Sequence, residues 1–263
     1  MSINLQNVIS RMIAEGKHFT DESKSSEKTL KKTLNKYIKP YLDEYCSNNN
    51  GKLIHKSQMS QYELQLFFHE IGGPFPSETS KKIKIRPDGG IFLMKKNGKM
   101  IPLLVIEDKI QGTNDIRCSK GLRRQSTGNA VERAFKNVRA AEMLFCKYNF
   151  FPYIIFCSGC DFHSTETIAD RLVIANLGYP NHKIDINSKT TDLLINERIE
   201  EIKRSIDIDK KHGKSVVTCF IKSHKWDDMP HGSSSWDEKE LLMLCKEVCD
   251  KVFKHLDLFI NQI

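Results

Sequence analysis

The stretch that decides the fold is Ile83–Ile110, which reads IKIRPDGGIFLMKKNGKMIPLLVIEDKI. Asn97-Gly98 near its centre is typical of a two-residue hairpin turn, because both residues tolerate the positive φ angles that such a turn requires. An apolar strand is predicted on each side of the turn, over Ile91–Met94 and Met100–Ile106. The stretch therefore predicts an antiparallel β-hairpin.

This hairpin brings two acidic residues together. If Asn97-Gly98 forms the loop, facing residues have numbers that add up to 195, so Asp88 faces Glu107. Directly opposed side chains have Cβ atoms about 4.5 to 5.5 Å apart, and like charges there destabilise the pair. A divalent cation between the two carboxylates removes the repulsion. On an extended strand Lys109 points to the same face as Glu107, and Asp108 points to the other face, from which only its carbonyl oxygen could reach a metal.

Asp88, Glu107 and Lys109 have the composition of a site that hydrolyses phosphodiesters. The two carboxylates would hold Mg²⁺, which neutralises charge on a phosphate and acidifies a bound water. The lysine would orient that water and stabilise the transition state. Spacing alone leaves two alternatives open: an exposed hairpin with solvated charges, and a β-bulge, permitted by Gly89-Gly90 and Pro102, that shifts the register.

Helices and strands alternate along the rest of the chain. Capping boxes open two of the helices, at Ser60 with Glu63 and at Ser235 with Glu238. Helices are expected over Thr29–Tyr45 with an interruption at Pro40, over Tyr62–Ile71, Thr127–Tyr148 and Thr165–Leu177, and up to about Leu258, and further strands over Phe151–Cys157 and Val216–Ile221. The pattern predicts an α/β fold with a central mixed β-sheet flanked by helices on both sides. We expect one domain over residues 1–263, with a helical N-terminal part over 1–75 and the core over 76–263.

Composition and charge favour a soluble protein that binds a polyanion. The 263 residues are 39% hydrophobic and 28% charged, which is typical of a globular protein, and neither a secretory signal nor a membrane span is evident. Eight cysteines in such a length are too few for a disulfide scaffold, so we expect a cytoplasmic location with reduced thiols. The formal charge is +8, and Lys81–Lys147 alone carries 16 basic and 6 acidic residues. A basic segment of this kind suits nucleic acid, although a solvated basic face is the alternative.

Two motifs resemble those of known nucleases. Arg86-Pro87-Asp88-Gly89-Gly90, followed by Glu107-Asp108-Lys109, resembles the Pro-Asp…(Asp/Glu)-x-Lys signature of a large nuclease superfamily. Gly128-Asn129-Ala130-Val131-Glu132-Arg133, followed by Lys136-Asn137, resembles the recognition helix of the EcoRI-type type II restriction endonucleases. Further matches follow in the same order, at Phe151-Pro152-Tyr153, Asp170-Arg171-Leu172, Ala175-Asn176 and Trp236-Asp237-x-Lys239. The similarity extends from about Gly72 to the C-terminus.

The resemblance implies a role for each matching site residue. Asp88, Glu107 and Lys109 would be catalytic, with Mg²⁺ held by the two acids. The DNA-binding residues would be Asn129, Ala130, Glu132, Arg133, Lys136 and Arg171. The chemistry of adenine agrees, because only adenine presents an N6 donor beside an N7 acceptor in the major groove, which suits Glu132 and Arg133. An ordinary surface Glu-Arg pair is the alternative for these two residues. Ile168 stands where the family has a second arginine, so the outer base pairs of the site are not implied.

The resemblance also implies an activity and partners. The family cleaves both DNA strands at palindromes, here one containing AATT, with Mg²⁺, and leaves 5′-phosphates and 5′ overhangs. A palindrome read by identical subunits implies a homodimer. An adenine methyltransferase that protects the host's own sites is the implied genetic partner. The alternatives are a repair or structure-specific nuclease of the same superfamily, and a DNA-binding module that has lost its activity.

Cys157, Cys160 and His163 have the spacing of zinc ligands, Cys-x-x-Cys-x-x-His. A structural zinc site needs four ligands, and no second pair of ligands follows at the spacing of a zinc finger. We therefore expect reduced cysteines at the end of a buried strand.

Overall fold

A computed structural model describes residues 19–112, 114, 117, 120–123, 137–146, 152–162, 183–190, 216–223 and 235–260. Of the predicted helix Thr127–Tyr148 only residues 137–146 fall in these ranges, and the predicted helix Thr165–Leu177 lies outside them. Among the described helices, none is both long enough and apolar enough to cross a bilayer. The division of the chain at residue 75 stays a prediction.

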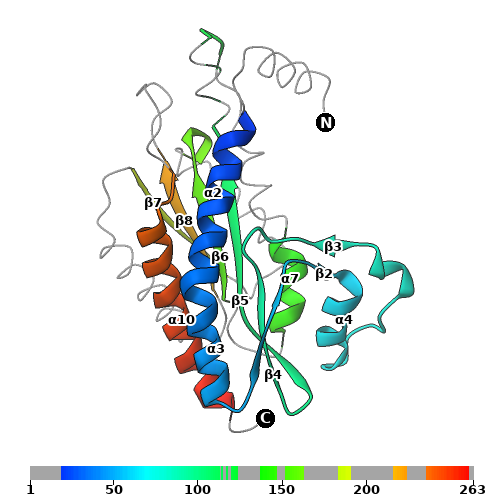
Figure 1. Ribbon diagram of the computed structural model, residues 1–263. Helices are drawn as coiled ribbons and strands as arrows, with labels where there is room; N and C mark the ends of the chain where they lie inside the picture. Colours follow the sequence, from blue (N-terminus) through cyan, green and yellow to red (C-terminus); the bar gives the residue numbers. More distant parts are fainter. Residues whose placement is uncertain are drawn as a thin grey trace.

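A six-stranded mixed sheet runs through the molecule in the order β1-β4-β5-β6-β8-β7 (Figure 1). The neighbours β1, β4 and β5 are antiparallel, whereas β5, β6, β8 and β7 run parallel to one another. In that order the strands are Lys52–Lys56, Gly90–Lys96, Lys99–Ile110, Tyr153–Ser158, Val216–Ser223 and Lys183–Thr190. Two short strands, β2 (Met59–Ser60) and β3 (Lys84–Ile85), form a separate antiparallel pair. The predicted mixed sheet is confirmed.

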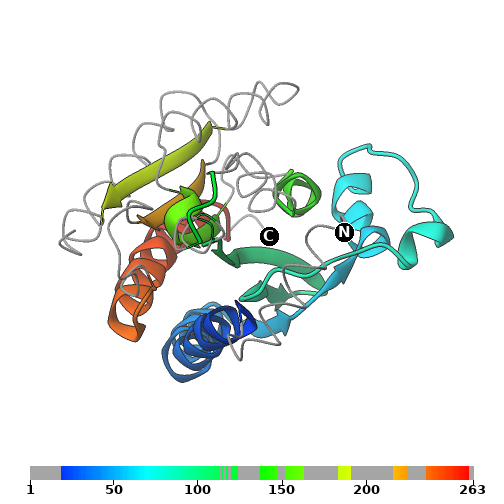
Figure 2. The same cartoon turned by 90° about the horizontal axis from the view of Figure 1, so that it is seen from above.

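Helices cover both faces of this sheet, as predicted (Figure 2). On one face lie α2 (Phe19–Thr33), α3 (Lys39–Asn48) and α10 (Glu238–Ile260). On the other face lie α4 (Gln61–His69) and α7 (Val138–Phe145). Each face therefore has its own hydrophobic core, which is the arrangement expected of an α/β fold.

Strand β6 shows why the central strands read as continuous apolar runs. All six of its residues are buried. Ile154 and Phe156 pack into the core on the α10 side, while Tyr153, Ile155 and Cys157 pack into the core on the α7 side. A strand that is buried on both faces cannot alternate between apolar and polar residues.

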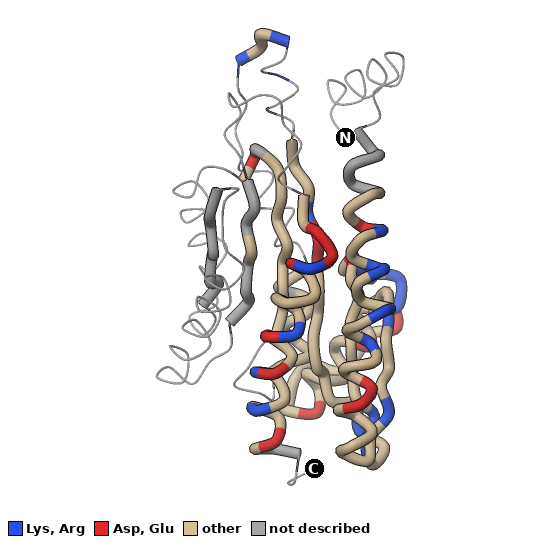
Figure 3. Tube along the Cα trace, turned by 60° about the vertical axis from the view of Figure 1, so that its left-hand side comes forward, with Lys and Arg blue, Asp and Glu red and all other residues tan. Residues whose placement is uncertain are grey.

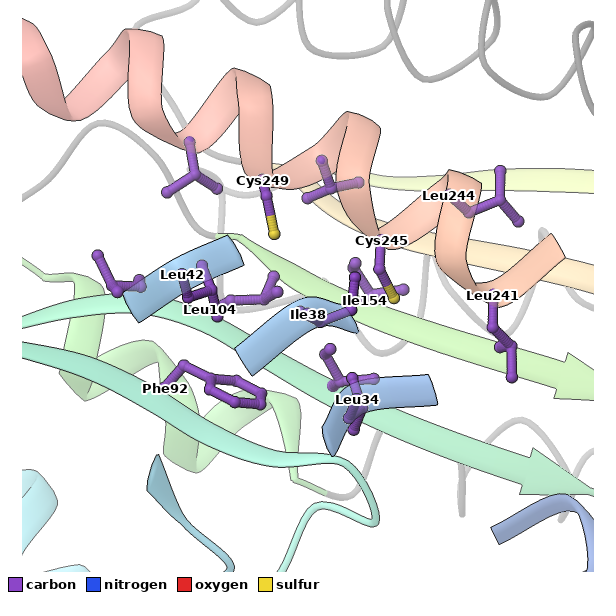
Figure 4. Packing of buried hydrophobic residues seen from close by; sticks show 14 of the residues in the cluster. Leu34, Ile38, Leu42, Phe92, Leu104, Ile154, Leu241, Leu244, Cys245 and Cys249 are labelled. Atoms are coloured by element: carbon purple, nitrogen blue, oxygen red, sulfur yellow. The ribbon is translucent and has the colours of Figure 1, made fainter. Parts of the chain in front are cut away.

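Three groups of elements contribute side chains to the core on the α10 side (Figure 4). Its labelled residues come from the N-terminal helices (Leu34, Ile38, Leu42), from the strands (Phe92, Leu104, Ile154) and from α10 (Leu241, Leu244, Cys245, Cys249). The intervals of three and four residues within each helix place these side chains on one stripe that faces the sheet. Cys245 and Cys249 are buried free thiols within this stripe, so they serve as small apolar core residues.

The turn of the β4–β5 hairpin is as predicted. Asn97 and Gly98 have φ angles of 51° and 77°, and Lys96 pairs with Lys99 across the turn. Two consecutive positive φ angles are the signature of a type I′ turn, whose twist matches that of the strands.

The register of the same hairpin changes further from the turn. An irregularity at Leu103 adds one residue to β5, so that Gly90 pairs with Ile106. The bulge that the sequence left open is therefore present, next to the proline that favours it. The strand pairing also ends at Gly90, so the predicted facing of Asp88 and Glu107 is not part of the ladder. Side-chain contacts bring these two residues together instead, as described below.

The predicted interruption near Pro40 takes the form of a π-helical turn over Leu34–Ile38, which separates α2 from α3. Pro40 lies in the first turn of α3, where a missing N–H is tolerated. Two other local predictions need correction. Strands β1 and β7 were not expected. The cap of α10 is Asp237 rather than Ser235: its carboxylate accepts from the Glu240 amide at 2.8 Å, and the Glu240 carboxylate accepts from the Asp237 amide at 3.0 Å. By contrast, the capping box of Ser60 and Glu63 is confirmed.

Charged residues of both signs alternate along the N-terminal helices and along α10 (Figure 3). Lys32 and Lys36 of the former contact Glu238 at the start of the latter. Twelve of the sixteen basic residues of Lys81–Lys147 and four of its six acidic residues lie within the described ranges. That this basic segment binds a polyanion stays a prediction.

Candidate active site

The end of the β4–β5 hairpin furthest from the turn holds the predicted catalytic residues. Asp88 precedes β4, and Glu107 and Lys109 lie near the end of β5. The backbone amide of Gly89 donates to the carbonyl oxygen of Ile106 at 2.9 Å, which fixes the segment that carries Asp88 against β5. Asp88 is thereby held beside Glu107 and Lys109.

Three oxygen atoms converge on the ammonium nitrogen of Lys109. Its Nζ lies 2.6 Å from Oδ2 of Asp88, 2.5 Å from Oε1 of Glu107 and 3.0 Å from the carbonyl oxygen of Asp108. The structure thus brings together the three side chains of the predicted catalytic set. The lysine supplies the counter-charge that two neighbouring carboxylates need.

The side chains of this charge cluster are largely buried, so their pKa values depend strongly on the neighbouring charges. The side chain of Glu107 is 1% exposed, whereas that of Asp88 is 32% exposed. Burial raises the pKa of Glu107, against the effect of the Lys109 ammonium. Burial alone would lower the pKa of Lys109, but the carboxylates of Glu107 and Asp88 outweigh it and raise this pKa. The lysine is therefore protonated at neutral pH, and the cluster opens to solvent on the side of Asp88.

Two further residues contact Glu107 and were not assigned a role from the sequence. The side-chain amide of Asn137 donates to both carboxylate oxygens, at 3.1 and 3.2 Å. The hydroxyl of Tyr153, at the start of β6, lies 3.5 Å from Oε2. Both residues lie within the family motifs quoted above, and this was the only sequence signal that could have identified them. Their contact with Glu107 depends on how α7 and β6 pack against β5, which the sequence pattern does not reveal.

Asp108 faces the opposite side of β5, as predicted. Its Oδ2 accepts a hydrogen bond of 2.7 Å from the hydroxyl of Ser26 on α2, and its Oδ1 is buried without a hydrogen-bond partner among the described residues. Burial raises the pKa of Asp108 to about 6. Alternation along β5 thus gives the two acids different surroundings, with Glu107 toward α7 and Asp108 toward α2.

The donor set suits a hard divalent cation. Asp88, Glu107 and the carbonyl of Asp108 offer only oxygen atoms, which are the ligands that Mg²⁺ prefers in proteins. These oxygens already surround one positive charge, that of Lys109. Within the described ranges, no three His, Cys, Asp or Glu side chains form a metal-binding group, so a cation here would rely on two carboxylates, the carbonyl and non-protein ligands such as water.

The predicted DNA-binding residues lie outside the described residues; they are Asn129, Ala130, Glu132, Arg133, Lys136 and Arg171. His163 also lies outside the described residues. The side chain of Cys157 is buried near the end of β6. The backbone carbonyl of Cys157 accepts a hydrogen bond of 3.3 Å from the Trp236 indole.

The chain resembles known proteins over much of its length. The family described as Restriction endonuclease EcoRI matches residues 14–261. The type II restriction enzyme EcoRI of Escherichia coli is 32% identical over 184 residues, which cover 58% of this chain and 61% of that enzyme. The type II restriction enzyme RsrI of Cereibacter sphaeroides is 35% identical over 92 residues, which cover 32% of this chain and 33% of that enzyme. Because the family match spans nearly the whole sequence, the chain belongs to the EcoRI family of restriction endonucleases.

Proposed function

We propose that the protein is a type II restriction endonuclease that hydrolyses phosphodiester bonds in both strands of DNA at a fixed palindrome. The observation that carries the proposal is the convergence of Asp88, Glu107 and the Asp108 carbonyl on Lys109, within a chain of this family. Two acids and a lysine at the end of a hairpin have little structural value of their own, since burying a charged cluster costs stability.

We assign Mg²⁺ as the cofactor, held by Asp88 and Glu107 with the carbonyl of Asp108. When bound, the ion supplies neutralisation of phosphate charge and acidification of a water. Lys109, kept protonated by its two acidic neighbours, orients the attacking water and stabilises the negative charge that develops on the phosphate. Asn137 and Tyr153 hold the carboxylate of Glu107 in place.

Specificity is assigned to the segment before α7. Asn129, Glu132 and Arg133 read adenine in the major groove of a site that contains AATT, and Ala130 lies against the bases. Lys136 contacts the phosphate backbone, and Arg171 lies near the recognition surface. The enzyme acts in the cytoplasm as a homodimer, one active site for each strand. A host adenine methyltransferase is its genetic partner, because an N6-methyl group removes a hydrogen that Glu132 would accept.

Digestion of a sequenced plasmid with Mg²⁺, followed by run-off sequencing of the ends, tests the activity. We expect cuts at one short palindrome containing AATT, with 5′-phosphates and 5′ overhangs. Cleavage at many unrelated sites or at DNA junctions would favour a repair or structure-specific nuclease.

Three variants test the residue roles. Glu107→Ala should bind DNA with the site without cutting it, whereas normal cutting would refute the catalytic assignment. Glu132→Ala and Arg133→Ala should lose rate and specificity. Absence of cutting by the parent protein, with retained sequence-specific binding, would identify an inactive DNA-binding module.

A further inference from the structure

His55 links the edge of the sheet to the turn that carries Asp88. It lies in β1 opposite Phe92 of β4, and the two rings stack with their centroids 4.5 Å apart. The Nε2 atom of His55 lies 3.2 Å from the carbonyl oxygen of Gly89. Because a carbonyl oxygen only accepts hydrogen bonds, Nε2 carries the hydrogen and donates it. Burial lowers the pKa of His55, so at neutral pH the ring is uncharged and its one N–H is engaged with Gly89.

The backbone next to Asp88 is held from two sides. The Gly89 amide donates to the carbonyl oxygen of Ile106 in β5 at 2.9 Å, and the Gly89 carbonyl accepts from His55 in β1. The peptide group between Asp88 and Gly89 is therefore fixed by one neighbouring strand, and the peptide group between Gly89 and Gly90 is fixed by the other. Both bonds together determine how the turn enters β4.

Gly90 makes room for the imidazole ring. Its φ is 85°, and a Cβ atom at this position would lie 2.4 Å from Nε2 of His55 and 2.9 Å from the carbonyl oxygen of Lys56. Any other residue would push the ring or the turn away. Glycine also places little restraint on backbone rotation, so the pair Gly89-Gly90 permits the close contact but does not stiffen the turn by itself. The restraint has to come from the hydrogen bonds.

Asp88 depends on this restraint because it precedes β4 and does not lie within a strand. Its side chain is 32% exposed, and its carboxylate contacts the Lys109 ammonium at 2.6 Å. Glu107, by contrast, lies inside β5 and is 1% exposed. The position of Asp88 beside the other two residues of the cluster is therefore set mainly by the backbone of the turn.

We propose that His55 is a positioning residue for the proposed hydrolysis: its Nε2–H holds the Gly89 carbonyl and thereby keeps Asp88 in place within the acid cluster. This proposal rests on the proposed function and adds to it a residue of β1 that acts through the backbone and not on the reacting atoms. Loss of the donor frees the peptide group between Gly89 and Gly90 to rotate, and Asp88 shifts with it.

Two substitutions separate the hydrogen bond from the ring. His55→Phe keeps a ring that stacks on Phe92 but removes the donor, whereas His55→Gln removes the ring and keeps an N–H donor. At saturating DNA with Mg²⁺, the single-turnover cleavage rate should fall at least about tenfold in His55→Phe and stay within about threefold of the parent in His55→Gln. A purely structural role would instead make the rate follow the stability measured by urea denaturation, where loss of the stacked ring makes His55→Gln the weaker variant.

His69→Phe is the matched control. His69 of α4 makes the same pair of contacts, with Nδ1 3.3 Å from the Gly73 carbonyl and its ring 4.5 Å from that of Phe75. These contacts do not involve the turn of Asp88, so this variant should cleave like the parent. If His55→Phe does not fold, His55→Leu takes its place as the variant without a donor.

Hydrogen exchange at the amides of Gly89 and Gly90 gives a readout that needs neither DNA nor a cation. We expect exchange to be at least about tenfold faster in His55→Phe than in the parent, because the turn opens more often without its bond to β1. Exchange in His55→Gln should be close to that of the parent.

The outcomes distinguish this proposal from the proposed function. Unchanged exchange in His55→Phe, or full cleavage by that variant, overturns the role of His55. Equal losses of cleavage rate in His55→Phe and His55→Gln overturn it as well, because the donor then makes no difference. If the parent protein cuts no DNA while exchange responds as expected, the proposed function fails, whereas His55 still holds the turn.

Discussion

Gly89 offers a direct test of how the hairpin positions Asp88. A Cβ atom at Gly89 would lie 2.7 Å from Cβ and 2.8 Å from Cγ2 of Ile106, and 3.1 Å from its carbonyl oxygen. Ile106 is fully buried, so it has little room to move away. The Gly89 amide also donates to that same carbonyl at 2.9 Å. Gly89→Ala therefore has to push the segment that carries Asp88 away from β5.

The expected effects follow from this displacement. Overpacking of a buried position costs about 1–3 kcal/mol, and we expect a loss of this size in the free energy of unfolding. Asp88 is the adjacent residue and lies 2.6 Å from the Lys109 ammonium, so a shift of the segment breaks this contact. A misplacement of about 1 Å in an active site lowers the rate on the order of a hundredfold. Urea denaturation and single-turnover cleavage of a duplex containing the site measure the two effects.

Gly98→Ala is the matched control at the other end of the hairpin. Gly98 has a φ of 77°, and a Cβ atom added there would meet no described atom within 4 Å, so alanine costs backbone strain of about 1 kcal/mol without a clash. We expect reduced stability with near-normal cleavage once the variant is folded. Equal losses of cleavage rate in both variants, or a fully active Gly89→Ala, would refute the reasoning.

Three further substitutions test single interactions by urea denaturation. Ser26→Ala removes the hydrogen bond to Asp108 and should cost about 1.5–3 kcal/mol, because the acceptor is a buried carboxylate; a neutral result would contradict that contact. Asp237→Ala removes the cap of α10 and should cost about 1 kcal/mol. Glu63 has a pKa lowered to about 2: burial opposes the shift, but hydrogen bonds from Lys56 and Ser60 prevail. The ionised Glu63 carboxylate stabilises the fold above its unfolded pKa, and this stabilisation is lost as pH falls from about 4.5 toward 2. Glu63→Gln should therefore lower the free energy of unfolding by roughly 1 kcal/mol at pH 7, after allowance for solvent screening. The difference between variant and parent should nearly vanish at about pH 2.

The parts of the fold that the sequence predicted depend on local rules. The Asn97-Gly98 turn sets its own geometry, and the runs of apolar residues in β5 and β6 are long enough to identify strands that are buried on both faces. The capping box at Ser60 needs only three residues of separation. Each of these features is set by a short continuous stretch of sequence, so it could be predicted without knowing how distant segments pack.

The parts that were missed depend on packing between distant segments. Strand β1 is short and partly exposed at the edge of the sheet, so its apolar pattern is weak. Lys183–Thr190 does alternate over Ile184 and Ile186, which was a usable signal for β7. The contacts of Asn137 and Tyr153 with Glu107 join three separate elements, and no spacing rule connects residues across a sheet and a helix.

The extra residue in β5 determines which face of the sheet carries the active site. Leu103 and Leu104 are consecutive, yet both pack into the core on the side of α2 and α10, so the alternation of side chains changes phase between them. Near the turn, Ile101 and Leu103 face the side of α2 and α10. If side chains alternated from there without the bulge, Glu107 and Lys109 would also face α2, away from α7. With it, they face the helix that Asn137 begins, and Asp108 takes the place beside α2. The bulge therefore does more than relieve the strand at a proline: it brings Glu107 and Lys109 to the face covered by α7, the helix that follows the predicted recognition segment in the sequence.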